Sequence, residues 1–358
     1  MNGAVATIRQ TSTAVPDHVM TQEDAKSAAR AVLPLRAERL AAVLALFDGA
    51  GVERRHTVLP VESFHSKRDL TVTMDLYREH AVRLGRQVAT DCLARAGVPA
   101  AAVDMVITVS CTGVMLPSLD AYLANELGFR PDVRRLPITE LGCCAGAAAL
   151  AHARDFIAAH PGACVLVISV ELPPLTFQRD DLTVANLVSS ALFGDGAAAV
   201  LLTGETAQSA PPGSVMVLES QSHLFPRTIE ALGFDLKQDG FHVVLARELP
   251  GIVRGEVATV VARLLARAGV AREQVEAFVL HPGGRKILEA LEEVLSLRPE
   301  QTRPSREVMR THGNVSSTTV LLVLHEWMTR RCPPPGTHGV LGAFGPGFTA
   351  ELSVLKWT

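Results

Sequence analysis

The chain has 358 residues, of which 48% are hydrophobic and 20% charged, with a formal net charge of −3. This composition predicts a large buried core and excludes a disordered or fibrous protein. Lysine and arginine form no run that suits nucleic acid or an anionic membrane, so neither is expected as a partner. The most apolar stretch, around Leu187–Leu202, is interrupted by Asp195, so no membrane span is predicted and a cytoplasmic protein is expected.

Helical and strand-like patterns alternate along the chain. Residues 21–47 predict one or two helices, and a longer helical pattern runs from about Thr71 to Ala96. Alternation of helices with apolar strands favours an α/β architecture. The apolar runs predicted as strands are Val103–Ser110, Ala163–Val170, Ala197–Leu202 and Val275–His281.

Pairs of matching segments recur in the same order along the chain. The sequence LARAGV occurs at Leu93–Val98 and again at Leu265–Val270, each time between a helical pattern and an apolar strand. These pairs predict two related α/β halves, residues 1–210 and 211–358, with a site where the halves meet. Fewer residues separate Phe193–Gly196 from Phe344–Gly347 than separate the members of the other pairs, which predicts a shorter connection in the second half. The other pairs are Gly142-Cys143 with Gly313-Asn314, and Phe193–Gly196 with Phe344–Gly347.

Cys143 is the candidate nucleophile among the six cysteines. No CxxC pair is present, which argues against a metal site or a disulfide framework. Gly142 allows a tight turn into a helix of small residues, and the positive end of a helix favours a thiolate over a thiol. A lone cysteine in such apolar surroundings can equally be an inert part of the core.

His281 and Asn314 are the polar residues that could act with Cys143. His281 follows an apolar strand and could stabilise the thiolate and donate to an oxyanion, or it could cap the next helix. Asn314 could bind an enolate oxygen through its amide, or it could be a helix N-cap. Cys143 and Asn314 occupy matching places in the two halves, so we expect the three side chains in one pocket.

Four motifs in this order resemble the type III polyketide synthases, the chalcone synthase-like group, and the likeness runs from about Val52 to the C-terminus. The resemblance implies a thiolase-like fold, with duplicated βαβαβ-type halves in αβαβα layers, and a homodimer. It also implies an acyltransferase that uses malonyl-CoA and acyl-CoA thioesters without a metal or another cofactor. The motifs are Gly142-Cys143-x-Ala145-Gly146, His281-Pro282-Gly283-Gly284, Gly313-Asn314-x-Ser316-Ser317 and Phe344-Gly345-Pro346-Gly347.

The resemblance assigns roles to the three candidates and to residues around them. It implies that Cys143 is the acylated nucleophile, and that His281 and Asn314 promote decarboxylation and hold the enolate. Phe193 and Phe241 resemble the two gatekeepers between the coenzyme A tunnel and the cavity. Other positions that the resemblance places at the substrate or at the dimer interface are Cys111 and Thr112 in the cavity wall, Gly345 and Pro346 in the last motif, and Leu116, which reaches across the dimer interface.

Some positions depart from the pattern of the plant enzymes. Cys111 stands where these usually carry threonine, although several bacterial members, including tetrahydroxynaphthalene synthases, have cysteine there. The basic residues that bind the coenzyme A phosphates have no match around Leu44–Gly51. Arg54 and Arg55 are the nearby candidates for this contact.

The function implied is iterative decarboxylative condensation of malonyl-CoA onto an acyl-CoA starter held on Cys143, followed by cyclisation to a pyrone or resorcinol-type product. A fatty-acyl starter is favoured, because Leu175–Asp181 resembles alkylpyrone-type bacterial members. A malonyl-primed aromatic synthase of the tetrahydroxynaphthalene type is the second possibility. A ketoacyl carrier-protein synthase III-like enzyme also uses Cys, His and Asn, as does a papain-like protease, whose cysteine signature is absent here. A non-catalytic subunit would not need all three residues.

Overall fold

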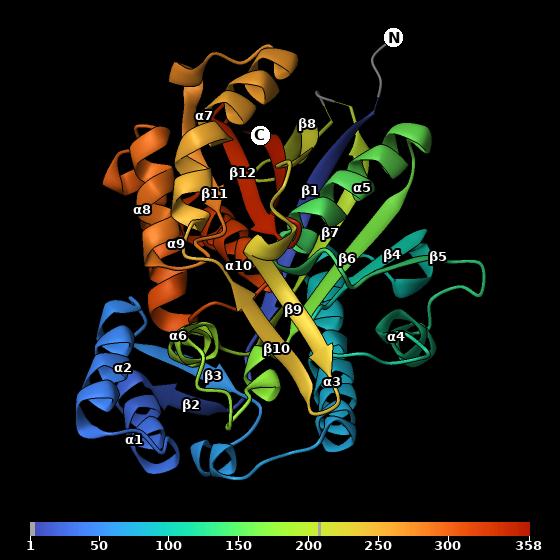
Figure 1. The fold of residues 1–358 in the computed structure, drawn as a ribbon. Helices are drawn as coiled ribbons and strands as arrows, with labels where there is room; N and C mark the ends of the chain where they lie inside the picture. The colour runs from blue at the N-terminus through green and yellow to red at the C-terminus, as the bar shows by residue number, and fades with distance from the viewer. Residues whose placement is uncertain (1–3, 207–208) are drawn as a thin grey trace.

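The computed structural model describes residues 4–206 and 209–358, whose strands form one nine-stranded sheet and two two-stranded sheets (Figure 1). The strands are β1 (Val5–Ala14), β2 (His18–Thr21), β3 (Arg54–Thr57), β4 (Met105–Val109), β5 (Arg134–Ile138), β6 (Cys164–Glu171), β7 (Gly196–Glu205), β8 (Val215–Leu224), β9 (Leu232–Lys237), β10 (Gly240–Leu245), β11 (Val275–Leu280), β12 (His338–Gly345) and β13 (Thr349–Trp357). The helices are α1 (Gln22–Val32), α2 (Ala37–Gly49), α3 (Leu70–Ala96), α4 (Leu119–Leu127), α5 (Ala145–Ala159), α6 (Val184–Leu192), α7 (Leu249–Ala268), α8 (Arg285–Val294), α9 (Pro299–His312) and α10 (Thr318–Glu326).

The large sheet repeats one strand pattern on each side of its centre. Its order is β11-β12-β13-β8-β1-β7-β6-β4-β5. On one side β4 and β6 are parallel, while β6–β7 and β7–β1 are antiparallel. On the other side β11 and β12 are parallel, while β12–β13 and β13–β8 are antiparallel. The two sides join through the antiparallel pair β1–β8, so the predicted α/β architecture is confirmed as two similar sheet halves.

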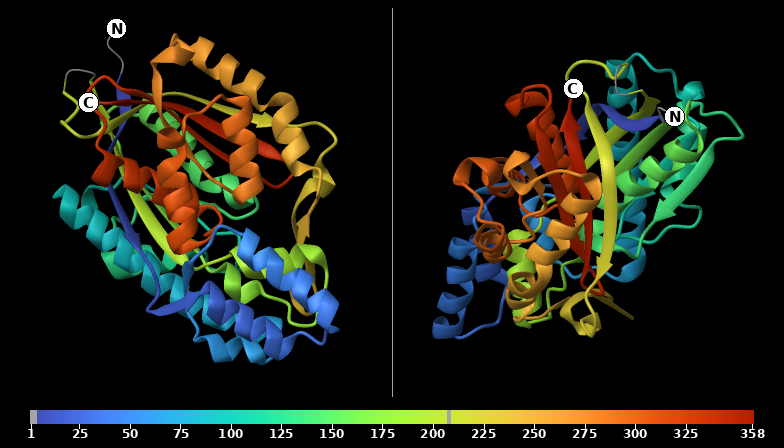
Figure 2. Two further views of the ribbon diagram at one scale, coloured as in Figure 1. Left: turned by 90° about the vertical axis from the view of Figure 1, so that its left-hand side faces the viewer. Right: turned by 90° about the horizontal axis from the view of Figure 1, so that it is seen from above.

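Helices lie on both outer faces of the sheet halves and between them (Figure 1, Figure 2). The helices α5 and α10 contact each other, and each contacts strands of both halves. On the outside, α3 covers β1, β6 and β7, and α7 covers β8 and β13. The sequence explains the central position: α5 is rich in alanine, which permits close approach, and α10 begins with an uninterrupted buried run. The layers therefore alternate as αβαβα.

Strands β4, β6 and β7 of the first half are buried along most of their length. All eight residues of β6 are buried, which explains why it reads as a continuous apolar run and not as an alternating one. One large hydrophobic cluster fills the space around α5 and α10, and separate clusters lie beneath α3 and beneath α7. Among residues 4–206 and 209–358, no helix is both long enough and apolar enough to cross a membrane.

A smaller layer made of α1, α2 and the antiparallel pair β2–β3 packs at one end of the molecule against α6 (Figure 1). Thr21 caps α1 through a reciprocal pair of hydrogen bonds with Asp24. The hairpin β9–β10 also packs against α6. These elements surround the chain segment that leads into β7, which includes Phe193.

The paired LARAGV segments adopt the same structure. Helix α3 ends at Gly97 with φ 65° and α7 ends at Gly269 with φ 67°. The amides of Val98 and Val270 donate to carbonyls of the preceding helical turn, each at 3.0 Å, as in a Schellman cap. The shorter connection predicted in the second half is also confirmed, because α6 lies between β6 and β7 whereas β12 and β13 are joined by residues 346–348.

Candidate active site

Cys143 lies in a 3₁₀ turn, Gly142–Cys144, that leads directly into α5. Gly142 has φ 55°, and a Cβ there would lie 2.4 Å from Pro346 Cδ, so only glycine fits. Gly146, one turn later, would place a Cβ 2.3 Å from the carbonyl oxygen of Ser317. Gly146 thus lets the start of α5 lie against the start of α10, and Gly142 lets the turn lie against Pro346.

Asn314 precedes α10 and is held from two sides. Its amide Nδ2 donates to the Gly283 carbonyl at 2.8 Å, and its Oδ1 accepts from the Ser316 amide at 2.8 Å. Its backbone pairs with that of Phe193 in an isolated bridge. One hydrogen of Nδ2 is therefore used in positioning the side chain, and within residues 4–206 and 209–358 no acceptor takes the second, which is available to a substrate.

His281 comes directly after β11, where its amide donates to the Gly342 carbonyl at 2.9 Å. The side chain is buried, and Nδ1 has no hydrogen-bond partner among the residues that the structure describes. Burial lowers the pKa of the imidazole to about 4. His281 is therefore neutral near pH 7 and is able to accept a proton.

Ser316 connects the candidate nucleophile to the other polar groups. Its hydroxyl lies 3.3 Å from Cys143 Sγ and 3.2 Å from Cys111 Sγ. Its amide holds Asn314, as described above, and its φ of 46° turns the chain between Asn314 and α10. Two of the three predicted catalytic residues, Cys143 and Asn314, therefore contact the same serine, and His281 lies two residues before the carbonyl that orients Asn314.

Glu171 forms the polar wall behind this cluster. Its buried carboxylate accepts from the Cys111 amide at 3.1 Å, from Thr112 Oγ1 at 2.7 Å and from the hydroxyl of Ser317. Burial raises its pKa, against these hydrogen bonds. Cys111 and Thr112, which the resemblance assigns to the cavity wall, therefore lie beside this cluster. Sequence reasoning missed Glu171 and Ser316. Two features of the sequence could have pointed to them: Glu171 is a lone acidic residue at the end of an apolar strand, and Ser316 lies inside the Gly313–Ser317 motif.

Comparison with known proteins identifies the family of this chain. The family described as chalcone and stilbene synthases matches with its N-terminal domain over residues 1–206 and with its C-terminal domain over residues 216–357. The chain belongs to the chalcone and stilbene synthase family. It is a type III polyketide synthase, and therefore an acyltransferase, with a thiolase-like fold. The family match favours this class over the carrier-protein synthase, the protease and the non-catalytic subunit.

Bacterial proteins are among the similar ones. The chain is 39% identical over 346 residues to a 1,3,6,8-tetrahydroxynaphthalene synthase of Streptomyces peucetius subsp. caesius, covering 96% of this chain and 91% of the relative. It is 33% identical over 361 residues to a putative chalcone synthase of Bacillus subtilis, covering 99% of each. The crystal structure of the tetrahydroxynaphthalene synthase of Streptomyces coelicolor superposes with a TM-score of 0.93 at 34% identity, covering 98% of this chain and 99% of that one.

In this type III polyketide synthase the protonation state of Cys143 differs from the thiolate that its position at a helix start predicts. Burial raises the pKa of Cys143 to about 11, the negative charge of Glu171 adds to this, and the Ser316 hydrogen bond opposes it. Because the pKa of His281 is low and that of Cys143 is high, both side chains are neutral near pH 7. The helix start and Ser316 therefore reduce the cost of forming the thiolate without making it the resting form.

The other predicted residues occupy three different environments. Phe193 lines an apolar cavity, and Phe241 is a buried residue of β10 whose ring meets Phe234 edge-on at 5.7 Å. Gly345 and Pro346 support the nucleophile turn, because a Cβ on Gly345 would lie 2.4 Å from Cys144 Sγ. Leu116 lies on the molecular surface and is 92% exposed.

The two arginines predicted to meet coenzyme A phosphates differ in position. Arg54 is exposed on β3. Arg55 is only 1% exposed, and its guanidinium donates to the carbonyls of Ser190 at 2.8 Å and Phe193 at 3.3 Å and to the Gln22 side chain. This position argues against a phosphate contact for Arg55 and in favour of a role in holding the backbone at Phe193.

Proposed function

We propose that Cys143 carries the growing chain as a thioester, and that His281 and Asn314 stabilise the enolate derived from malonyl-CoA. The observation that carries this proposal is the cluster at the facing starts of α5 and α10, where Ser316 contacts both the Cys143 thiol and the Asn314 side chain. A nucleophile and an oxyanion donor supported by one residue are suited to acyl transfer.

In the first step Cys143 takes the starter acyl group from coenzyme A. The thiol gives its proton to the neutral imidazole of His281, and the sulfur bonds to the thioester carbonyl carbon. The bond from that carbon to the coenzyme A sulfur then breaks, and His281 returns the proton to the departing thiolate. A thiol with a pKa of about 11 needs such a base near pH 7, and His281 with a pKa of about 4 is a weak one.

In the second step malonyl-CoA is decarboxylated and extends the chain. The bond to the carboxylate breaks, and its electron pair moves onto the thioester carbonyl as an enolate. The free N–H of Asn314 and the imidazole N–H of His281 donate to the enolate oxygen. The enolate carbon attacks the Cys143 thioester and releases the sulfur, and return of the longer chain to Cys143 repeats the cycle. No cofactor besides the coenzyme A substrates enters these steps.

We infer an acyl-CoA starter and a pyrone or resorcinol-type product. The alternative is a malonyl-primed aromatic synthase, which the 39% identity to a 1,3,6,8-tetrahydroxynaphthalene synthase favours. Relatives described as a phloroglucinol synthase of Pseudomonas fluorescens and a 3,5-dihydroxyphenylacetyl-CoA synthase of Streptomyces toyocaensis, 33% and 32% identical, indicate how far products diverge among similar chains.

We also infer that residues 1–210 and 211–358 are duplicated halves and that two chains form a homodimer across Leu116. The mirrored strand order supports the first inference, and the exposure of Leu116 supports the second. In this proposal Phe193 and Phe241 are gatekeepers, and exposed Arg54 is the remaining predicted arginine for a coenzyme A phosphate.

Product analysis tests the proposal. Purified protein is incubated with labelled malonyl-CoA and a panel of starter acyl-CoA thioesters, and the products are identified by mass spectrometry. We expect pyrones or resorcinols from the wild type without carrier protein, and none from Cys143→Ala. An aromatic product from malonyl-CoA alone would select the malonyl-primed alternative. The absence of condensation with every coenzyme A thioester would disprove the assignment of these residues and substrates.

A further inference from the structure

A histidine ties the tip of the β9–β10 hairpin to the segment before α6. His242 lies on β10, and its side chain is 14% exposed. Its Nε2 lies 2.9 Å from a carboxylate oxygen of Asp239 in the hairpin turn. Its Nδ1 lies 3.3 Å from a carboxylate oxygen of Asp181, which precedes α6. The imidazole therefore bridges two carboxylates from different segments of the chain.

Only the protonated ring satisfies both of these contacts. A neutral imidazole has one N–H and one lone pair, so it would turn a lone pair toward one carboxylate, whereas the imidazolium donates from both nitrogens. The hydrogen bond with His242 lowers the pKa of Asp239. For Asp181, burial raises the pKa, but hydrogen bonds from Thr183 and His242 outweigh it and lower the pKa overall. Both acids are therefore ionised near pH 7.

Further charged groups surround this bridge. Lys67, which precedes α3, forms an ion pair with Asp180 at 3.0 Å, and its charge also acts on the aspartate of the hairpin turn. Asp235 stands opposite the histidine where β9 pairs with β10, and Arg179 lies near Lys67. Aspartates outnumber basic groups here, so the surroundings attract a positive charge.

The two sides of the bridge are held differently. Asn186 of α6 donates to the carbonyls of Gln178 at 2.7 Å and Asp181 at 2.8 Å, which fixes the segment before α6. The hairpin, in contrast, is a two-stranded sheet of its own, and the last three residues of β9 are exposed. Because an isolated hairpin is marginally stable, its tip depends on side-chain contacts such as the bridge of His242.

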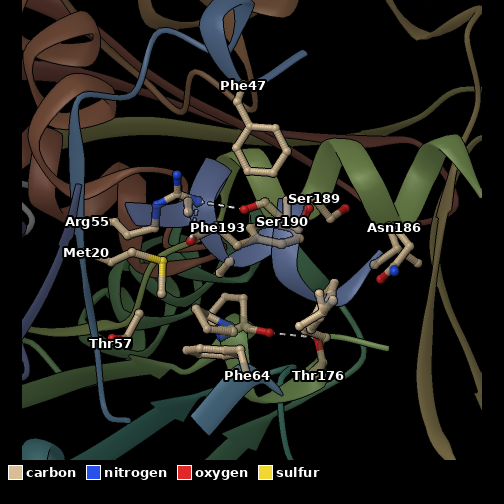
Figure 3. A pocket seen from close by; sticks show the side chains of 18 of the residues that line it. Met20, Phe47, Arg55, Thr57, Phe64, Thr176, Asn186, Ser189, Ser190 and Phe193 are labelled. Atoms are coloured by element: carbon tan, nitrogen blue, oxygen red, sulfur yellow. Dashed lines mark hydrogen bonds between the residues drawn. The ribbon is translucent and has the colours of Figure 1, made fainter. Parts of the chain in front are cut away.

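The hairpin extends from this bridge toward the candidate active site (Figure 1). Near its base, a Cβ on Gly233 would lie 4.0 Å from Pro346, the residue that packs against the turn of the candidate nucleophile. Phe241, which directly precedes the histidine, is buried. Val243 lines the apolar cavity in which Figure 3 shows Phe193. A displaced hairpin would therefore move side chains on both sides of the proposed gate.

We propose that the imidazolium of His242 is a positioning residue, which holds the β9–β10 hairpin closed and thereby places Phe241 beside the active site. Loss of the ring proton removes one of the two hydrogen bonds and releases the hairpin tip from the segment before α6. Access of coenzyme A thioesters then depends on pH through a residue that does not touch the reacting atoms. The effect on access rests on the proposed function, whereas the release of the hairpin does not.

Hydrogen–deuterium exchange of residues 232–245 tests the release without any substrate. The wild type is compared with His242→Gln, with Asp181→Asn and with the double variant at several pH values between about 6 and 8, where a histidine usually changes its charge. Ratios of rates at the same pH cancel the intrinsic pH dependence of exchange. His223→Gln is the control, because His223 also lies near an acid, with its Nε2 3.9 Å from Glu256, but belongs to β8.

Near pH 6 we expect the hairpin to exchange about tenfold faster in His242→Gln than in the wild type, the scale of one hydrogen bond to a charged group. This ratio should approach one toward pH 8, as the wild type loses the bridge. The double variant should exchange no faster than His242→Gln, because both substitutions break the same contact. Exchange of β6 should be unchanged in all proteins, and His223→Gln should match the wild type throughout.

Kinetics test the effect on access. Near pH 6 we expect KM for malonyl-CoA to rise about fivefold in His242→Gln with a smaller change in kcat, because binding must then order the hairpin. A hairpin that exchanges alike in His242→Gln and the wild type, or a ratio that does not vary with pH, overturns the proposal. Faster exchange with an unchanged KM overturns the link to access. Absence of condensation in the wild type would instead disprove the proposed function, and exchange alone would still decide whether His242 holds the hairpin.

Discussion

At the scale of single residues, the chemistry depends on how a buried thiol loses its proton. Burial and the charge of Glu171 both raise the pKa of Cys143, and the hydroxyl of Ser316 is the side chain whose hydrogen bond lowers it. The backbone of Ser316 has a separate role, because its amide holds Asn314. A substitution that removes only the hydroxyl therefore separates thiol activation from the positioning of the amide.

For Ser316→Ala we expect slower alkylation of Cys143 by iodoacetamide at neutral pH. One hydrogen bond is worth about 1 kcal/mol, which corresponds to roughly fivefold less thiolate. Peptide mapping after timed alkylation across a pH series gives the rate at Cys143. The matched control is Ser317→Ala, whose hydroxyl contacts Glu171 and not Cys143, and it should have a smaller effect. Identical pH profiles for Ser316→Ala and the wild type would show that the hydroxyl does not activate the thiol.

Asn314 is expected to act in decarboxylation and not in loading. Asn314→Ala removes the free amide hydrogen, and loss of one such donor typically slows a step by on the order of a hundredfold. Release of carbon dioxide from labelled malonyl-CoA should fall by that amount, while acylation of Cys143 measured by mass spectrometry should change little. Equal losses in both steps would mean that the variant has disturbed the whole site through its contact with Gly283.

At the scale of elements, the hairpin formed by β12 and β13 supports the turn that carries Cys143. A Cβ on Gly345 would lie 2.4 Å from Cys144 Sγ and 2.5 Å from the Leu141 carbonyl oxygen, so Gly345→Ala forces that turn to move. We expect a loss of about 1–3 kcal/mol in unfolding free energy, measured with urea, together with slower loading of Cys143. Gly251→Ala in α7 is the control, because nothing lies within 4 Å of the added carbon and alanine favours a helix. If Gly345→Ala matches the control in both measurements, the support is dispensable.

The same elements show how far sequence patterns reach. The helix expected over Thr71–Ala96 is α3, Leu70–Ala96, and the strand expected over Val103–Ser110 is β4, Met105–Val109, because buried elements carry clear apolar periodicity. The hairpin β9–β10 was not predicted, since half-exposed strands lack a continuous apolar run. The motifs made Cys143, His281 and Asn314 the candidates, which remain a prediction. The contacts of Ser316 and Glu171 with Cys143 and Cys111 depend on distant segments that only the fold brings together.

At the scale of the whole molecule, burial of neutral histidines links stability to pH. His312, beside His56 and close to Arg54 and Arg330, has its pKa lowered from 6.5 to about 4, mainly by burial. Because the folded-state pKa is depressed, the unfolded chain binds the proton first as pH falls, so this contribution to stability is complete above pH 6.5 and is lost toward pH 4.

Urea unfolding is measured at a series of pH values between 7.5 and 5. As pH is lowered, the unfolding free energy should decrease more steeply for the wild type than for His312→Gln. The difference between the two slopes should approach, at most, roughly 1.4 kcal/mol per pH unit for one histidine. Taking this difference cancels the opposite contributions of buried acids such as Asp195, whose pKa burial raises. Parallel curves would show that His312 titrates alike in the folded and unfolded states.

Assembly of two chains is the remaining property of the whole molecule, and Leu116 gives its test. Leu116 is 92% exposed and Val114, two residues earlier, is 55% exposed, which is costly for apolar side chains in a free surface loop. If this loop lies in a dimer interface, Leu116→Asp buries a charge there and should weaken the dimer at least tenfold in sedimentation velocity experiments. Ile229→Asp, at a residue that is 79% exposed on another segment, should leave assembly unchanged. A dimer that resists Leu116→Asp but dissociates on Ile229→Asp would move the interface to the β8–β9 side of the molecule.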